Sequence, residues 1–194
     1  MILLVVGLLL FLCLHSARVV APQARSGIIA RIGEGGWKGL YSLLSLGFLV
    51  LVIYGFAVAR ADTPVLWYPP VWTQHIALVL MLPAMICLAA SFLPAGHIKA
   101  RAKFPLVLSV KIWALAHLIA NGELSSILLF ATFLAWGVVL RISLKRRAAE
   151  GEVTLPVFVS GRYDAIAVVA GLALWGWMIL GLHEWLIGVA PLVF

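Results

Sequence analysis

The sequence predicts an all-α, polytopic transmembrane bundle of about six helices, with the N-terminus and the C-terminus outside the cytoplasm. Of the 194 residues, 64% are hydrophobic and only 11% are charged, whereas a soluble domain carries about 25% charged residues. The basic residues lie in short segments between long apolar runs, as in membrane loops. The net charge of +7 therefore indicates membrane topology and not nucleic-acid binding. At this length we expect a single domain covering residues 1–194.

Each predicted helix is an apolar run that approaches the roughly 20 residues needed to cross a hydrocarbon core of about 30 Å. The first run is stopped by Pro22, Pro83 is expected to kink the third, and the fourth follows Pro105. Asn121-Gly122 is a turn signal, so the fourth and fifth helices are expected to form a close hairpin. The predicted helices cover residues 2–21, 37–59, 75–92, 106–121, 125–140 and 163–188.

The orientation in the membrane follows from the lysine and arginine residues. Twelve of the fourteen lie in the segments that follow the first, third and fifth predicted helices or, like Arg18 and Lys38, in the helix ends that border the first of these segments. Arg60 lies on the other side, and Lys111 lies within the fourth helix. Because cytoplasmic loops carry the excess of Lys and Arg, these three segments are predicted to be cytoplasmic.

The five histidines are the first candidates for chemistry, because imidazole binds metals and titrates near neutrality. His97 is expected in a cytoplasmic loop, and His75 and His183 are expected at the outer surface. His15 and His117 lie inside apolar runs, where a polar side chain is costly and a functional role is the default hypothesis. A hydrogen bond to a neighbouring helix explains such a histidine equally well. The sequence leaves both interpretations open.

The predicted helix 106–121 carries the most informative spacing. Trp113, His117 and Asn121 follow one another at intervals of four residues, so they share one face of the helix. We therefore expect an aromatic ring, an imidazole and an amide in a row towards the interior of the bundle.

Lys111 lies on a different face of the same helix, about 9 Å along its axis from Pro105. Its ammonium group either extends to the cytoplasmic surface along an apolar stem or pairs with a carboxylate. Glu34 and Asp164 are the candidate partners at that surface.

The remaining notable segments have simple explanations in a membrane protein. The aromatic segment 63–72 is typical of an interfacial belt, with a lid over a pocket as the alternative. The basic cluster 141–147 sets topology, and contact with anionic lipid is a second role. Cys13 and Cys87 lie in apolar runs without CxxC spacing, which indicates neither disulfides nor a zinc cluster.

Several short stretches together carry a resemblance to a known family. They are His15-Ser16-Ala17-Arg18, Gly39-Leu40-Tyr41-Ser42-Leu43, Trp72-Thr73-Gln74-His75, the segment 113–121, and Phe133-Leu134-Ala135-Trp136. In combination they resemble the NnrU family of bacterial membrane proteins, from the first predicted helix through the fifth. The resemblance implies a multi-pass protein of the bacterial inner (cytoplasmic) membrane. It also implies an association with nitrite and nitric oxide reduction in denitrification.

The NnrU family is similar to the 15-cis-zeta-carotene isomerase of plants and cyanobacteria, and this similarity implies a haem b cofactor. In that membrane enzyme one axial histidine lies on an early helix and the other in a Trp-x-Leu-Ala-His stretch. The resemblance therefore implies that His15 and His117 are the axial ligands here. Ala114 stands where the plant enzyme has a cysteine, so a switch to thiolate ligation is not available at that position.

Other residues of the fourth predicted helix are included in the expected cofactor site, namely Lys111, Trp113 and Asn121. Measured along the helices, His15 and His117 differ in depth by about 14 Å in a core of about 30 Å. Two imidazoles on one iron allow that separation if the porphyrin lies rather flat in the membrane. His75, on the same side as His117, is the rival ligand.

Two classes of function follow. One is a haem-b-binding redox protein or redox-gated isomerase that acts on a lipophilic substrate in the bilayer. The other is a non-catalytic assembly or transport factor that supports nitrite and nitric oxide reduction, with respiratory proteins as partners. The sequence leaves open whether the chain is an enzyme.

Overall fold

The computed structural model describes residues 1–192, and every extended regular element in that range is helical. Five of its helical segments are long and apolar enough to cross a membrane: α1 (Ile2–Val20), α2 (Pro22–Ala61), α3 (Val71–Phe92), α6 (Leu124–Ala149) and the segment Arg162–Ile187. A shorter apolar helix, α5, covers Pro105–Ala120. The prediction of an all-α, polytopic membrane protein of about six helices is confirmed.

Several boundaries differ from the predicted ones for local reasons. α2 begins at Pro22 and not near residue 37, because Pro22 is accommodated in its first turn and the chain stays helical as far as a break at Gly33. Gly33 has a φ of 73°, a left-handed value that glycine adopts without steric cost. α6 continues past residue 140 to Ala149, so the basic cluster 141–147 is helical. Arg147 in this cluster is 8% exposed, and its Nε donates to Glu152 at 3.1 Å.

The last predicted helix is divided in the structure. It consists of α7 (Arg162–Trp177), a π-helical turn (Met178–Leu182) and the short helix α8 (His183–Ile187). Gly181 lies in the break with a φ of 156°, and Gly188 ends α8 in the left-handed conformation. A short helix that the sequence did not predict, α4, covers His97–Ala102.

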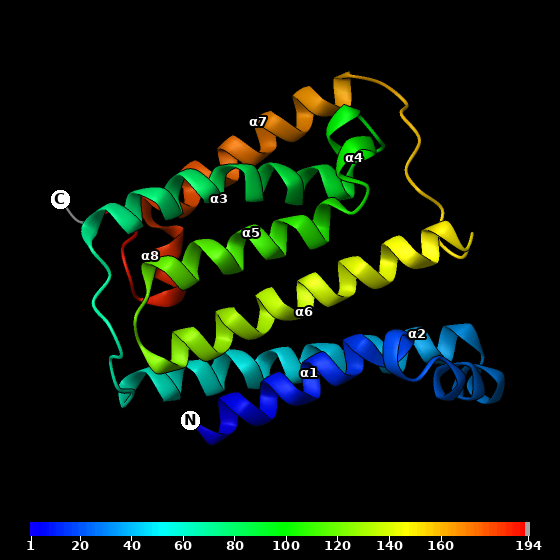
Figure 1. Cartoon of the computed structure of the whole chain (residues 1–194), viewed down its shortest axis with the longest axis horizontal. Coiled ribbons are helices and arrows are strands. Elements are labelled where there is room, and N and C mark those ends of the chain that lie inside the picture. Colours follow the sequence, from blue (N-terminus) through cyan, green and yellow to red (C-terminus); the bar gives the residue numbers. More distant parts are fainter. Residues whose placement is uncertain (193–194) are drawn as a thin grey trace. The chain divides into compact units, whose positions relative to one another are not determined.

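The chain forms two compact units, which are described separately. The first comprises residues 1–67 and 122–132, and the second comprises residues 68–121 and the described chain from Phe133 on. In the first unit α1 lies along α2 (Figure 1). A Cβ atom on Gly55 would lie 2.6 Å from the backbone nitrogen of Leu4, and one on Gly7 would lie 3.0 Å from that of Val52. Glycine at both positions therefore lets the two backbones approach closely, as in many membrane helix pairs.

The segment after α2 is also fixed within the first unit. Leu66 N donates to Gly122 O at 2.8 Å, and Leu124 N donates to Pro64 O at 3.0 Å. These bonds form an isolated antiparallel bridge, Val65 with Glu123. The aromatic residues that follow are exposed, with Tyr68 at 84%, which favours the interfacial belt over a lid.

In the second unit α3 packs against α5 and α7 (Figure 1). The contact with α7 is close at Gly171, where a Cβ atom would lie 2.7 Å from the Cα of Ile86. Further along, Trp175 Nε1 donates to Leu78 O at 2.9 Å, in the turn of α3 before Pro83. α3 continues as a helix through this proline.

The predicted cytoplasmic end of the second unit is organised by one carboxylate. Asp164 accepts hydrogen bonds from the backbone N–H groups of His97 and Ile98, both at 2.8 Å, and from His97 Nδ1 at 2.9 Å. It satisfies the first N–H groups of α4, which have no partner within the helix itself. A side chain at Gly96 would clash with this carboxylate. Asp164 is thus a helix cap.

Candidate functional site

His15 lies on the face of α1 that meets α2 in the first unit. Its ring stacks on Phe11, one turn earlier, with centroids 4.0 Å apart. Its Nδ1 is 2.7 Å from Phe11 O. Because a carbonyl oxygen only accepts, Nδ1 carries the proton, and the neutral ring has its lone pair on Nε2. In that tautomer the Ser45 hydroxyl, 3.3 Å from Nε2, is the donor.

A ladder of side chains on α2 faces this imidazole. Trp37, Tyr41 and Ser45 are spaced by four residues and therefore share one face. The ring of Tyr41 lies 5.4 Å from that of His15, and the rings of Trp37 and Tyr41 are 5.8 Å apart. This face was not predicted from the sequence, although its residues have the same spacing as the row Trp113, His117 and Asn121 on α5.

His117 lies on α5, in the second unit, and its ring makes the same kind of hydrogen bond as that of His15. Its Nδ1 is 2.9 Å from Trp113 O, so this nitrogen also carries the proton. Asn121 Nδ2 donates to His117 O at 2.8 Å, so a hydrogen bond joins Asn121 to the residue one turn before it. The Trp113 ring lies 5.5 Å from the His117 ring and meets Phe133 of α6 edge-on at 5.6 Å. Trp113, His117 and Asn121 therefore share one face, as their spacing predicts.

His183 lies beside His117, which the sequence did not predict. The two ring centroids are 6.2 Å apart, and the ring planes differ by 23°. His183 Nδ1 is 2.7 Å from Val189 O, so it has the same tautomer as the other two. The helix break at Gly181 and the left-handed Gly188 produce this arrangement, because they turn the chain around His183. In the sequence, these two glycines were the only indication that the helix is interrupted on either side of His183.

The other predicted site residues have different surroundings. His75 is exposed on α3. Lys111 is half-buried, and its Cγ would lie 2.7 Å from a Cβ atom on Gly137, so its stem packs at that glycine. Within residues 1–192 no carboxylate lies within 4.0 Å of the Lys111 ammonium. The two candidate partners pair elsewhere, Glu34 with Lys38 at 4.0 Å and Asp164 with His97.

The described residues 1–192 contain no group of three or more His, Cys, Asp or Glu side chains arranged to hold a bare metal ion. Iron in a porphyrin makes a smaller demand, because the macrocycle supplies four ligands and the protein adds one or two. Single histidines of fixed tautomer, such as His15 and His117, fit that demand.

Comparison with family models adds a global observation to this geometry. The family model described as NnrU protein matches residues 3–191 of the chain. The chain belongs to the NnrU family. The match begins within α1 and covers the other helices that the structure describes, so the resemblance carried by the short stretches is confirmed over nearly the whole chain. Comparisons with curated proteins and with solved structures found no match.

Proposed function

We propose that this NnrU protein binds haem b through His15 and His117, and that it is a redox protein or redox-gated isomerase acting on a lipophilic substrate in the bilayer. The observation that most supports this proposal is the state of the two imidazoles. Each Nδ1 donates to the backbone carbonyl four residues earlier, at 2.7 Å for His15 and 2.9 Å for His117.

A histidine that binds a metal through one ring nitrogen almost always donates a hydrogen bond from the other, and this hydrogen bond is present here. The partner of the second ring nitrogen fixes the tautomer, orients the ring and raises the basicity of the ligating nitrogen. Here both partners are backbone atoms of the histidine's own helix, so each imidazole is oriented before a ligand binds. When bound, haem would supply one-electron redox chemistry.

Aromatic side chains beside each histidine suit a flat apolar macrocycle. Phe11 and Tyr41 lie beside His15, and Trp113 lies beside His117. Lys111 has no carboxylate partner within residues 1–192, so its cation suits a haem propionate, and Asn121 supplies an amide at the end of the row. We assign these residues to orientation of the cofactor and to the exclusion of water.

Because its ring lies beside that of His117, we also consider His183 as a rival ligand, in addition to His75. Two imidazoles that held one iron together would have ring centroids roughly 6 Å apart, from about 2 Å for each metal–nitrogen bond plus the distance from nitrogen to ring centre. The separation of His117 and His183 is 6.2 Å. A His117–His183 pair is therefore the alternative set.

The test is the reduced-minus-oxidised absorption spectrum of the purified protein and of single histidine-to-alanine variants, after expression with ample haem. We expect the haem bands to be lost in His15→Ala and His117→Ala and retained in His75→Ala. His97→Ala is the matched control, because that ring is bound to Asp164 at the predicted cytoplasmic surface. Loss in His183→Ala with retention in His15→Ala would replace His15 by His183 as the second ligand.

Size-exclusion profiles of all variants distinguish a variant that no longer binds haem from one that no longer folds, because a folded variant elutes as the unmodified protein does. A well-folded protein without haem bands would refute the proposal. It would favour the alternative function, a non-catalytic assembly or transport factor for nitrite and nitric oxide reduction.

A further inference from the structure

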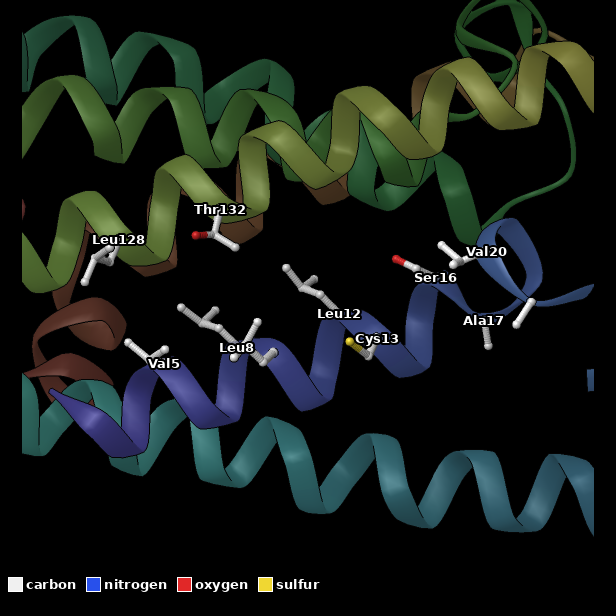
Figure 2. A pocket seen from close by; sticks show the side chains of 11 residues that line it. Val5, Leu8, Leu12, Cys13, Ser16, Ala17, Val20, Leu128 and Thr132 are labelled. Atoms are coloured by element: carbon white, nitrogen blue, oxygen red, sulfur yellow. The ribbon is translucent and has the colours of Figure 1, made fainter. Parts of the chain in front are cut away.

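The first unit contains an apolar groove of about 500 Å³ along α1, with Leu128 and Thr132 of α6 on its other side (Figure 2). No charged side chain lines this groove, and nothing in the structure shows what covers it. The second unit is different, because there two charged side chains meet between two helices.

These two side chains, Lys111 and Arg141, lie where α5 meets α6. The stem of Lys111 packs at Gly137, where a Cβ atom would lie 2.7 Å from Lys111 Cγ. Arg141 lies four residues further along α6 and therefore on the same face of that helix. Its Nη2 donates to Ala102 O at 3.4 Å, just before α5 begins. We call the contact region of Ala102, Lys111, Gly137 and Arg141 the α5–α6 seam.

The two cationic groups are directed to the same level of the membrane. α5 begins at the predicted cytoplasmic end, and the Cα–Cβ bonds of a helix tilt towards its N-terminus, so the stem of Lys111 starts towards that end. Arg141 lies about 6 Å beyond Gly137 in the same direction, because four residues rise about 1.5 Å each. A lysine with an apolar stem extends its ammonium group in this way.

No carboxylate compensates these two charges. In the described part of the second unit, the carboxylates at the predicted cytoplasmic end pair with other residues, namely Glu150 with Arg146, Glu152 with Arg147, and Asp164 with His97. Within residues 1–192, Arg141 Nη1 is buried and has no hydrogen-bond partner. A buried donor without an acceptor costs free energy, and the cost is larger for a charged group.

An anion in the seam would remove this cost. Two like charges at one place repel each other, and a partly buried charge without a counter-charge destabilises the fold. Water can accept a hydrogen bond from Nη1, but it leaves both charges uncompensated. A carboxylate or phosphate group accepts strong hydrogen bonds from a guanidinium and from an ammonium group at the same time.

We propose that Lys111 and Arg141 together bind one oxyanion in the α5–α6 seam, a phosphate or carboxylate group. Two molecules can supply it. One is an anionic phospholipid of the cytoplasmic leaflet, because basic pockets between helices on this side bind lipid head groups. The other is haem through a propionate, and only that case rests on the proposed function. The site itself contains neither His15 nor His117.

The first arm of the test uses full-length protein prepared without haem, in detergent micelles that contain phosphatidylglycerol. The measurement is the mole fraction of this lipid that gives half of the rise in thermal midpoint, with phosphatidylcholine as the reference. For a lipid phosphate, Arg141→Gln and Lys111→Met should each raise this mole fraction roughly tenfold, because each removes a hydrogen bond between charged groups. Lys145→Gln is the matched control, since it removes a positive charge from an exposed position on α6.

The second arm measures the ratio of haem absorbance to protein after loading with haem or with haem dimethyl ester, whose propionates are blocked. For a propionate, the same two variants should lower this ratio roughly tenfold for haem, relative to Lys145→Gln, and leave it unchanged for the ester. If the unmodified protein binds no haem, the proposed function fails, and the phosphatidylglycerol arm alone decides whether the oxyanion site exists.

A measurement on the unmodified protein covers the case in which the variants do not fold. Phenylglyoxal modifies arginine side chains, and mass spectrometry gives the rate at each position. Phosphatidylglycerol or haem should slow the modification of Arg141 and leave that of Arg146, whose side chain is 72% exposed, nearly unchanged. The proposal is overturned if neither ligand protects Arg141 more than Arg146. It is also overturned if Arg141→Gln or Lys111→Met behaves as Lys145→Gln does in both arms.

Discussion

Replacing Gly55 by alanine tests whether α1 and α2 are held by close backbone contact. A Cβ atom at this position would lie 2.6 Å from Leu4 N and 2.8 Å from Leu3 C, and both atoms belong to the backbone of α1. Ordinary van der Waals contact begins near 3.4 Å, so the two helices must separate by about 0.8 Å, the difference between 3.4 and 2.6. A backbone cannot rotate away as a flexible side chain can.

The expected cost follows from two opposing contributions. Overpacking of this kind destabilises a protein by about 1–3 kcal/mol. Alanine in place of glycine stabilises an isolated helix by up to about 1 kcal/mol. Gly47→Ala on the same helix measures the second contribution alone, because a Cβ atom there has no neighbour within 4 Å. The difference between the two variants should therefore be about 1–3 kcal/mol.

The assay is the thermal midpoint of the purified protein in detergent, followed by fluorescence-detected size-exclusion chromatography. We expect Gly55→Ala to lower the midpoint by several degrees relative to Gly47→Ala. If both substitutions raise the midpoint equally, α1 and α2 do not make the close contact at Gly55, and the reasoning is refuted.

Three further predictions concern other parts of the chain. Reporter fusions in the three basic segments should behave as cytoplasmic and a fusion at the C-terminus as external; a cytoplasmic C-terminus would contradict the predicted orientation. Lys111→Met should lower haem retention, measured as the ratio of haem absorbance to protein, with an unchanged folded yield, because methionine keeps an apolar stem beside Gly137; unchanged retention would show that Lys111 only extends to the surface. Asp164→Ala should speed tryptic cleavage in α4, because it removes the cap of that helix, whereas Glu34→Ala, at an exposed pair, should not; equal rates would refute the capping role.

The predicted helices and the structure agree best where the signal is spread over many residues. The long apolar runs of α1 and α3 specify spans because each residue contributes a little to the transfer of the segment into lipid. The row of Trp113, His117 and Asn121 was also predictable, because its members lie on one helix and its geometry follows from the helical repeat.

The predicted helices and contacts differ from the structure where one residue determines the local structure. Gly33 and Gly181 break helices that hydropathy alone continues, since a glycine costs little hydrophobicity but permits a positive φ. Asp164 was expected among the partners of Lys111 and instead caps α4, because the N–H groups that it satisfies come from a segment distant in the sequence.

By itself the sequence determined the class of the protein, its membrane spans, its family and the two histidines placed inside apolar runs. These properties depend on composition, on charge asymmetry and on spacing within one helix, and none requires knowledge of which helices are neighbours. Only the tertiary structure decided the surroundings of the imidazoles, namely Ser45 and Tyr41 beside His15 and the approach of His183 to His117. Such contacts depend on how helix faces meet and on where the chain turns. Gly55 controls the first through steric fit and Gly181 the second through its positive φ, and neither property has a signature in hydropathy.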